Sequence, residues 1–287
     1  MIPPSDSPFV KNLTLPPSRP AFSLVELMVV LGVVTFLAAV SAGVYQKMTA
    51  QGRALREVQA GRRLIAAYLT HAAENNGTYL PGMDFTVGKI WFEPYQRDVT
   101  IMHAANRYPF RLAPYLDYEL RGSILVNALS TQINTMAKPG TAMHDYVVSA
   151  FPTFGINYYF VGGCVSGTPA APVLTYPGDC TSRSGQTTKP LLVFASGGTT
   201  DGVKRVEGFN ILTPPRLYAE TWSTAEWSEK EDPGLHGNID ARHGGRAVCA
   251  FLDGSVRLHR IAELRDMRLW NRRAAEADDP SYTLPME

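Results

Sequence analysis

An uncharged apolar stretch near the N-terminus constrains this chain more than any other feature. Residues 27–45 include no charged side chain, and a helix of that length is about long enough to cross a hydrocarbon core of roughly 30 Å. One acid, Glu26, stands at the N-terminal edge of the stretch. A carboxylate at the edge of a bilayer is costly without a partner, so Glu26 is a candidate functional residue.

Three interpretations of the apolar stretch compete. A cleaved secretory signal has a shorter apolar region, a small-x-small cleavage site after it and no acid at its head. An ordinary membrane anchor needs no acid either. The third interpretation comes from the residues at its start, which read Ala21-Phe22-Ser23-Leu24-Val25-Glu26-Leu27. This segment resembles the processing site of type IV prepilins and of type II secretion pseudopilins.

The resemblance implies that prepilin peptidase cuts between Ala21 and Phe22 and that the new N-terminus is methylated. The family usually has Gly before the cut, where this chain has Ala21. Glu26 becomes the fifth residue of the mature chain, and the family pairs this acid with the α-amino group of a neighbouring subunit, here on Phe22. Such pairing compensates a buried charge. The alternative is a simple anchor whose acid lies at the lipid headgroups.

Residues 1–21 are then a leader peptide, which we exclude from the fold. This segment is rich in proline, including Pro3, Pro16 and Pro20, and cannot form a continuous helix. Basic residues follow the apolar stretch, and counting charges alone would place the rest of the chain in the cytoplasm. The processing motif favours the opposite orientation, with the head outside, and we give it precedence.

The helix is expected to continue beyond residue 45, so that one long helix spans residues 22–75. The segment 46–74 contains no proline, and its apolar residues recur at helical spacing. Arg53, Arg56, Glu57 and the Arg62-Arg63 pair lie mostly off this stripe. The triplet Asn75-Asn76-Gly77 is a strong stop signal. The stripe consists of Leu55, Val58, Ile65, Leu69 and Ala72.

The remaining residues, 76–287, predict a globular β-rich head. Segments 154–161 and 189–195 are rich in strand-forming residues, and turn-rich stretches separate many such short segments. One long helix followed by many short strands predicts an α+β fold, in which a long N-terminal helix, membrane-spanning in its first half (27–45), packs on a C-terminal antiparallel β-sheet head.

Residues 241–258 predict a β-hairpin near the C-terminus. Asp253-Gly254 suits a two-residue turn that requires positive φ. The strand before it is apolar on both faces, which predicts a central strand. Residues 261–275 are expected to form one short helix.

His243, followed after nine residues by Asp253-Gly254, carries a second resemblance. It resembles the prepilin-processing-associated module of large pilin-like families of planctomycetes and verrucomicrobia. Two positions depart from that pattern, since the family often has Asn at the position of Val248 and His at that of Ser255. The two resemblances cover residues 22–75 and 240–260, and together they are more specific than either one alone.

The motif residues His243 and Asp253 admit three interpretations. A His–Asp pair can orient a base or bind a metal, and three further residues near in sequence allow a metal cluster to be drawn: His236, Asp240 and His259. Asp253, however, has a sufficient role in the turn. We therefore favour a structural role. We expect no catalytic residue, no metal and no cofactor, since no nucleophile elbow, Walker loop or HExxH motif is present.

The charge and cysteine content set further limits. The net charge of +1 gives no indication of nucleic-acid binding. Cys164 and Cys180 flank a loop rich in Gly, Pro and Thr, whereas Cys249 lies in an apolar run. If the head is outside the cytoplasm, as the resemblance implies, Cys164 and Cys180 are candidates for a disulfide and Cys249 remains unpaired.

The sequence thus predicts a structural pilin-like subunit of a type IV pilus or type II secretion pseudopilus, and not an enzyme. It would reside in the inner membrane as a single-pass protein with its head outside the cytoplasm, and then in the filament. Its expected partners are other pilin or pseudopilin subunits, prepilin peptidase/methylase, the inner-membrane assembly platform and membrane lipid. The alternatives are a membrane-anchored extracytoplasmic binding module, with or without a metal, that does not polymerise, and a membrane-tethered hydrolase or metalloenzyme.

Overall fold

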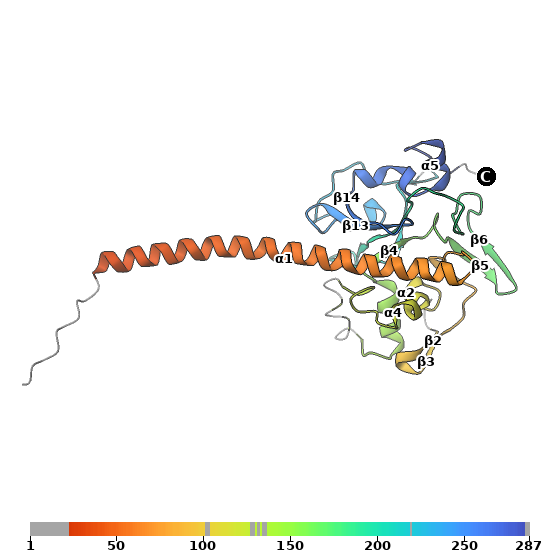
Figure 1. Ribbon diagram of the computed structural model, residues 1–287, viewed down its shortest axis with the longest axis horizontal. Coiled ribbons are helices and arrows are strands. Elements are labelled where there is room, and N and C mark those ends of the chain that lie inside the picture. Colours follow the sequence, from red (N-terminus) through yellow and green to blue (C-terminus); the bar gives the residue numbers. More distant parts are fainter. Residues whose placement is uncertain are drawn as a thin grey trace, which may run out of the picture. The chain divides into compact units, whose positions relative to one another are not determined.

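The computed structural model describes residues 23–100, 104–126, 130, 133, 137–218 and 220–284. The chain divides into two compact units, Met1–Thr49 and Ala50–Glu287. The fold is of the α+β class and begins with the long helix α1, Leu24–Glu74, of 51 residues (Figure 1). The predicted N-terminal apolar helix is therefore confirmed.

Local sequence signals fix both ends of α1. At its start, Glu26 Oε2 accepts a hydrogen bond from the Ser23 backbone N–H at 2.9 Å, and Ser23 Oγ accepts one from the Glu26 N–H at 3.2 Å. This reciprocal pair is a capping box. At its end, Asn76 and Gly77 take φ values of 52° and 77°, and the Gly77 N–H donates to the Ala72 carbonyl at 2.8 Å. A left-handed pair of this kind ends a helix, as the sequence predicts.

The first unit contains an exposed apolar helix. The segment Leu24–Ser41 has a mean hydropathy of 2.4 and none of it is buried. By length and composition alone, this segment is long and apolar enough to cross a membrane.

A five-stranded sheet lies at the centre of the second unit, in the order β10–β4–β7–β13–β14. Neighbouring strands are antiparallel except β10 and β4, which are parallel. The sheet is therefore mostly antiparallel, with one parallel pair at its β10 edge. The strands of this sheet are β4 (Phe154–Asn157), β7 (Leu192–Ser196), β10 (Ile211–Leu212), β13 (Arg246–Phe251) and β14 (Val256–Arg260).

Smaller elements surround this sheet. The remaining strands are β1 (Met83–Asp84), β2 (Ile90–Phe92), β3 (Arg97–Val99), β5 (Cys164–Thr168), β6 (Ala171–Leu174), β8 (Gly198–Thr200), β9 (Arg205–Glu207), β11 (Arg216–Leu217) and β12 (Glu220–Thr221). The helices after α1 with described bounds are η1 (Glu93–Tyr95), α2 (Tyr108–Leu112), η2 (Ala113–Leu116), α4 (Ala142–Ala150), η3 (Pro233–His236), η4 (Glu263–Arg265), η5 (Met267–Leu269) and α5 (Arg272–Ala277). Figure 1 shows α2 and α4 on one side of the second half of α1 and the β13–β14 hairpin on the other.

Strand β13 has apolar residues on both faces, as the sequence predicts for an interior strand. Val248 and Ala250 belong to one buried cluster, whereas Ala247, Cys249 and Phe251 belong to another. The strand lies between β7 and β14. Successive side chains of a strand point to opposite faces, so a strand with two apolar faces must be covered on both sides.

The second half of α1 contributes to the first of these clusters. Leu64, Ile65 and Tyr68 are buried and share the cluster with Phe154 and Phe194. Leu55, placed on the apolar stripe by the sequence pattern, is instead 64% exposed. The buried face of α1 is therefore rotated from the predicted stripe, and it includes Glu57, Ala60 and Gly61.

Two local predictions for the C-terminal region are wrong. Residues 261–275 do not form one helix, because Asp266 and Asn271 each interrupt the chain with an extended residue. Their side chains accept the N–H of Arg268 and of Ala274, which starts η5 and α5 anew. In the turn between β13 and β14 only Gly254 has positive φ, at 79°. The turn is one residue longer than the predicted two-residue turn, because the Gly254 N–H donates to the Phe251 carbonyl and the Phe251 N–H donates to the Ser255 carbonyl.

The burial of residues on the second half of α1 predicts how substitutions there change the stability of the protein. Leu64→Ala should lower the free energy of unfolding by about 2–5 kcal/mol, because Leu64 is fully buried and its removal leaves a cavity. Leu55→Ala, the same change on the same helix at an exposed position, should alter it by less than about 0.5 kcal/mol. Urea denaturation of the full chain in mild detergent measures both, and equal losses would contradict the burial described above.

Candidate functional site

The structure places the predicted processing residues only in part. Ala21 and Phe22 lie outside the described residues, so the predicted cut remains a prediction. Glu26 is described, and it lies in the capping box with Ser23. A carboxylate in the first turn of a helix also interacts favourably with the helix dipole. Glu26 therefore has a local role in starting α1, which the sequence analysis did not anticipate.

A polar cluster surrounds Glu57 of α1 in the second unit. Its sequence position off the apolar stripe suggested exposure, yet the side chain is only 4% exposed. Ser196 of β7 donates a hydrogen bond from its Oγ to Glu57 Oε1 and accepts one from the Val248 N–H at 2.8 Å. His243 Nε2 lies 2.9 Å from Glu57 Oε2. The predicted motif residue His243 thus contacts α1, which is 186 residues away in sequence.

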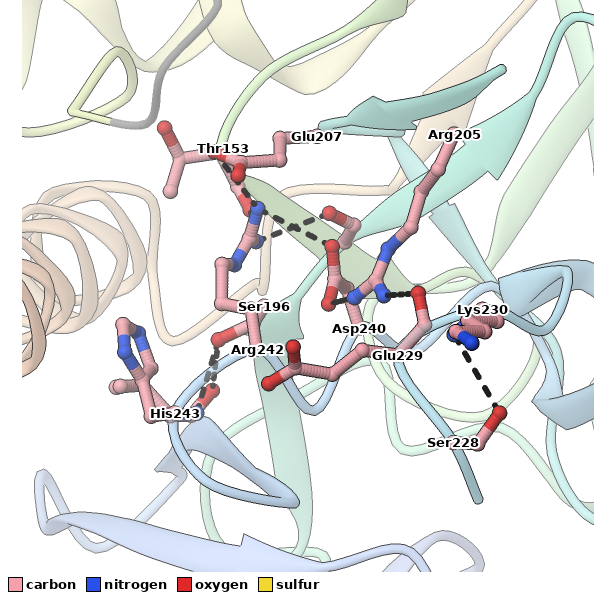
Figure 2. A network of polar contacts seen from close by, with 12 residues as sticks. Thr153, Ser196, Arg205, Glu207, Ser228, Glu229, Lys230, Asp240, Arg242 and His243 are labelled. Carbon is pink, nitrogen blue, oxygen red and sulfur yellow. Dashed lines mark hydrogen bonds and ion pairs between the residues drawn. The ribbon is translucent and has the colours of Figure 1, made fainter. Parts of the chain in front are cut away.

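Arg242, next to His243, supplies the positive charge of this cluster. Its Nε lies 3.4 Å from Glu57 Oε2, a distance for an ion pair rather than for an aligned hydrogen bond. Its Nη2 donates to the carbonyls of Thr153, at 3.1 Å, and of Gly197, at 3.0 Å. Its Nη1 lies 3.4 Å from Asp240 Oδ2 (Figure 2). One largely buried guanidinium therefore joins three carboxylates, including Glu207 at 3.8 Å, and two carbonyls.

Asp240 extends the cluster toward the surface. It is fully buried and forms an ion pair with Arg205 of β9. Arg205 also donates to the Glu229 carbonyl at 2.6 Å and lies over the ring of Trp227 at 4.9 Å from its centroid. Figure 2 shows Arg242 and Arg205 on either side of Asp240. A buried carboxylate between two guanidiniums is well compensated.

The pKa of Glu57 is lower than its ordinary value. Burial alone would raise this pKa, because it disfavours the charged form. The charge of Arg242 and the hydrogen bonds from His243 and Ser196 outweigh burial. Glu57 is therefore ionised near neutral pH, as the cluster requires.

The geometry of the cluster fits a structural network better than a catalytic one. A serine nucleophile needs a base that accepts its proton, and in triads this base is the imidazole. Here Ser196 and His243 both bind the same carboxylate, and Ser196 accepts a backbone N–H as well. The arrangement holds the three side chains in place and leaves the Ser196 oxygen bonded on both sides.

The residues from which a metal cluster could be drawn have separate partners. His236 contacts Glu231 at 3.2 Å, Asp240 binds Arg205, and His259 contacts Glu263 at 3.0 Å. Within the described ranges, no three His, Cys, Asp or Glu side chains gather as they would around a metal ion. The structure thus does not bring these residues together.

Asp253 and Gly254 serve the hairpin turn. Asp253 Oδ1 accepts the Ser255 N–H at 2.9 Å, and its Oδ2 lies 4.0 Å from the exposed Arg257. His243 binds α1 instead. The two ends of the His-x9-Asp-Gly motif therefore have different structural roles at the two ends of β13.

The candidate disulfide is not formed in this structure. Cys164 and Cys180 are both buried and free, and so is Cys249. The Tyr158 hydroxyl lies 2.9 Å from the Cys164 sulfur. Burial raises the pKa of Cys180 and of Cys249, which keeps both as thiols.

Sequence reasoning identified His243 and missed the other members of its polar cluster. Glu57, Ser196 and Arg205 come from three segments that are distant in sequence, and no local pattern links them. One signal was available: an acid in the middle of an amphipathic helix, among several arginines. It does not by itself distinguish a buried acid from an exposed one.

Comparisons with known proteins add no assignment. No protein-family model matches the chain, and searches of the curated proteins and of the solved structures give no match either. The functional argument therefore rests on the residues and contacts of this chain.

The Glu57 cluster predicts a pH-dependent stability. Glu57→Gln should lower the free energy of unfolding by about 3 kcal/mol near pH 7, because it leaves Arg242 buried with one carboxylate fewer. Since the folded pKa lies below the ordinary value of 4.5, the stabilisation is complete above 4.5 and is lost as the pH falls through the folded pKa. The difference between the two proteins should therefore shrink in acid.

Urea denaturation at a series of pH values from neutral to acid measures this difference. Glu74→Gln is the matched control, because Glu74 is an exposed acid on the same helix. It should change the stability by less than about 0.5 kcal/mol at every pH. A Glu57→Gln protein that is as stable as the wild type near neutral pH would show that the cluster is not stabilising.

Proposed function

We propose that this chain is a structural pilin-like subunit of a type IV pilus or a type II secretion pseudopilus, assembled through its N-terminal helix. The observation that carries the proposal is the exposed apolar first part of α1, which begins next to Ser23 and has Glu26 in its first turn. From Leu24 to Val40 each large apolar side chain is at least half exposed. Full burial of one such side chain is worth about 1.5–3 kcal/mol, so this surface requires a cover of lipid or of other helices.

A filament subunit uses such a helix twice. In the membrane the 18 residues Leu24–Ser41 rise about 27 Å, which is close to the thickness of the hydrocarbon core. In the filament the same surface packs against the helices of neighbouring subunits. The need for two different covers explains why the surface has no partner within the described part of its own chain.

The second half of α1 is the part of the helix that would hold the head. We infer that the second half of α1 packs on the sheet of the head, as in pilins. A Cβ on Gly61 would lie 3.3–3.5 Å from Val256, Phe154 and Val248, which belong to three strands of the sheet. Together with the Glu57 cluster, this close approach supports a head that is held by the helix.

In this proposal prepilin peptidase cuts before Phe22, the new N-terminus is methylated and Glu26 neutralises the α-amino group of an adjacent subunit. The subunit waits in the inner membrane with its head outside the cytoplasm. The capping box supports the position of Glu26 at the first turn of the helix, where the chain would begin after the cut. Its partners are then other subunits, the peptidase/methylase, the assembly platform and lipid.

A membrane-anchored binding module that does not polymerise is the second candidate. A cavity in the head with aromatic and polar side chains in its walls, described below, favours this candidate. The two candidates agree on the membrane helix and differ in processing and in the role of Glu26. Both differences are measurable.

The first experiment concerns the N-terminus. The intact mass and N-terminal sequence of the chain recovered from host membranes should show a protein that begins at methylated Phe22. In cells without prepilin peptidase it should begin at Met1. A chain that begins at Met1 in cells with an active peptidase would contradict the pilin proposal and favour the anchored module.

The second experiment separates the charge of Glu26 from its capping role. Glu26→Gln keeps the capping hydrogen bonds, because Gln also serves in capping boxes, but it removes the charge. We expect Glu26→Gln to insert into the membrane at wild-type levels and to lose incorporation into filaments by at least about tenfold, since the α-amino group then has no counter-charge.

Filament incorporation is measured by quantifying the subunit in sheared filaments against the membrane fraction. Glu26→Ala, which loses both the charge and the cap, should be no better incorporated than Glu26→Gln. Wild-type incorporation of Glu26→Gln would mean that Glu26 serves only as a cap, and the proposed pairing with Phe22 would be wrong.

A further inference from the structure

A cavity of about 350 Å³ lies in the head among η1, the segment after η2 and helix α4. Its volume is in the range of small-molecule sites. Most of its walls are aromatic or aliphatic, and three polar side chains line it as well. Its lining includes Phe92, Tyr95, Tyr118, Glu119, Arg121 and His144.

Aromatic rings form one wall of the cavity. Phe92 packs against Tyr95 with ring centroids 4.9 Å apart and against Tyr118 at 5.7 Å. Tyr95 in turn meets His144 edge to face at 6.0 Å. Rings packed in this way present faces and edges suited to another flat ring.

His144 is the buried polar group of the cavity. It belongs to the first turn of α4, is 6% exposed and lines the cavity. Its Nδ1 is buried and has no hydrogen-bond partner among the described residues. Burial, and then the charges of Arg121 and Arg97, lower its pKa, so its imidazole is neutral near pH 7. A buried polar nitrogen without a partner loses free energy that a ligand's hydrogen bond would restore.

Arg121 gives the cavity its positive charge. Both Arg121 and Arg97 are near enough to act on His144, but Arg97 is paired with the buried Asp145 at 2.7 Å. Arg121 is exposed and forms no ion pair within the described ranges. Glu119 lines the same rim and is exposed. An anionic group on a ligand would find its counter-charge at Arg121.

Strained backbone positions hold the aromatic wall. Asp117 and Tyr118 both have positive φ, at 52° and 59°, a conformation that is a true outlier for a bulky residue such as Tyr. Hydrogen bonds hold the following segment, since the Thr153 N–H donates to the Ile124 carbonyl at 2.8 Å and Ser123 Oγ donates to the Glu119 carbonyl at 2.9 Å. Strain of this kind persists where the surroundings over-determine it, and it is common in binding sites.

We propose that this cavity is a binding site for a small aromatic carboxylate. The ring of the ligand packs against Phe92, Tyr95 and Tyr118, a polar substituent on the ring hydrogen-bonds to His144 Nδ1, and the carboxylate pairs with Arg121. The aromatic wall selects the flat ring, and the buried nitrogen selects a substituent such as a hydroxyl. This inference is independent of whether the chain polymerises, because it rests on the head alone.

The test is isothermal titration calorimetry of the full chain in mild detergent, with 4-hydroxyphenylacetate as the probe. We expect saturable one-to-one binding. Tyramine, which has the same hydroxylated ring but an amine in place of the carboxylate, should bind at least about tenfold more weakly, and Arg121→Gln should raise the Kd for 4-hydroxyphenylacetate by at least about tenfold. Phenylacetate, which lacks the hydroxyl, should also bind more weakly.

Arg216→Gln is the matched control, since Arg216 is another exposed arginine of the head outside the cavity lining. Its Kd should stay within about twofold of the wild type. Arg121 is exposed, so its variant is expected to fold, and circular dichroism checks this. No saturable binding of 4-hydroxyphenylacetate up to about 10 mM, equal binding of tyramine, or an unchanged Kd in Arg121→Gln would each overturn the proposal.

Discussion

The second unit depends on the contacts that the buried carboxylate of Glu57 makes. This carboxylate brings together a helix, strand β7 and the segment before β13 through Ser196, Arg242 and His243. A buried ion pair of this kind contributes little net stability when it is intact, but it is costly to break, because the remaining charge stays uncompensated. A shift of α1 by one residue would rotate Glu57 by about 100° away from its partners. The cluster therefore fixes the register of the helix more strictly than apolar packing alone would.

One helix carries two kinds of surface, and this division organises the chain. The first part of α1 is apolar and exposed all round, and the second part has a buried face that includes Leu64 and Tyr68. The central sheet is likewise apolar on both faces, with Val248 on one side and Cys249 on the other. The first cluster includes α1 and the second includes the C-terminal segment around Trp270. Residues from two distant parts of the chain thus belong to the two buried clusters that include residues of this sheet.

Sequence reasoning succeeded where the signal was local. Asn76-Gly77 ended α1 where expected, and the apolar run in β13 indicated an interior strand. It failed where polar side chains restart a helix, as Asp266 does. It also failed for Glu57, because its partners lie in distant segments and an acid on a helix is usually exposed. The cavity gave no sequence signal, since Tyr118 adopts positive φ without a glycine to indicate it.

Two of the three acids of α1, Glu26 and Glu57, differ in the partners that they have within the described residues. Glu57 is satisfied within its own subunit by Arg242 and His243, so it can be tested by stability alone. Glu26 has only a cap as its partner within the described residues, and a cap is replaceable by an uncharged residue such as Gln. A charge kept at the head of an apolar helix is costly in lipid, and capping alone does not require it. The contacts of Glu26 among the described residues are those of the cap, whereas the cationic partner proposed above, outside the folded subunit, would also use its charge.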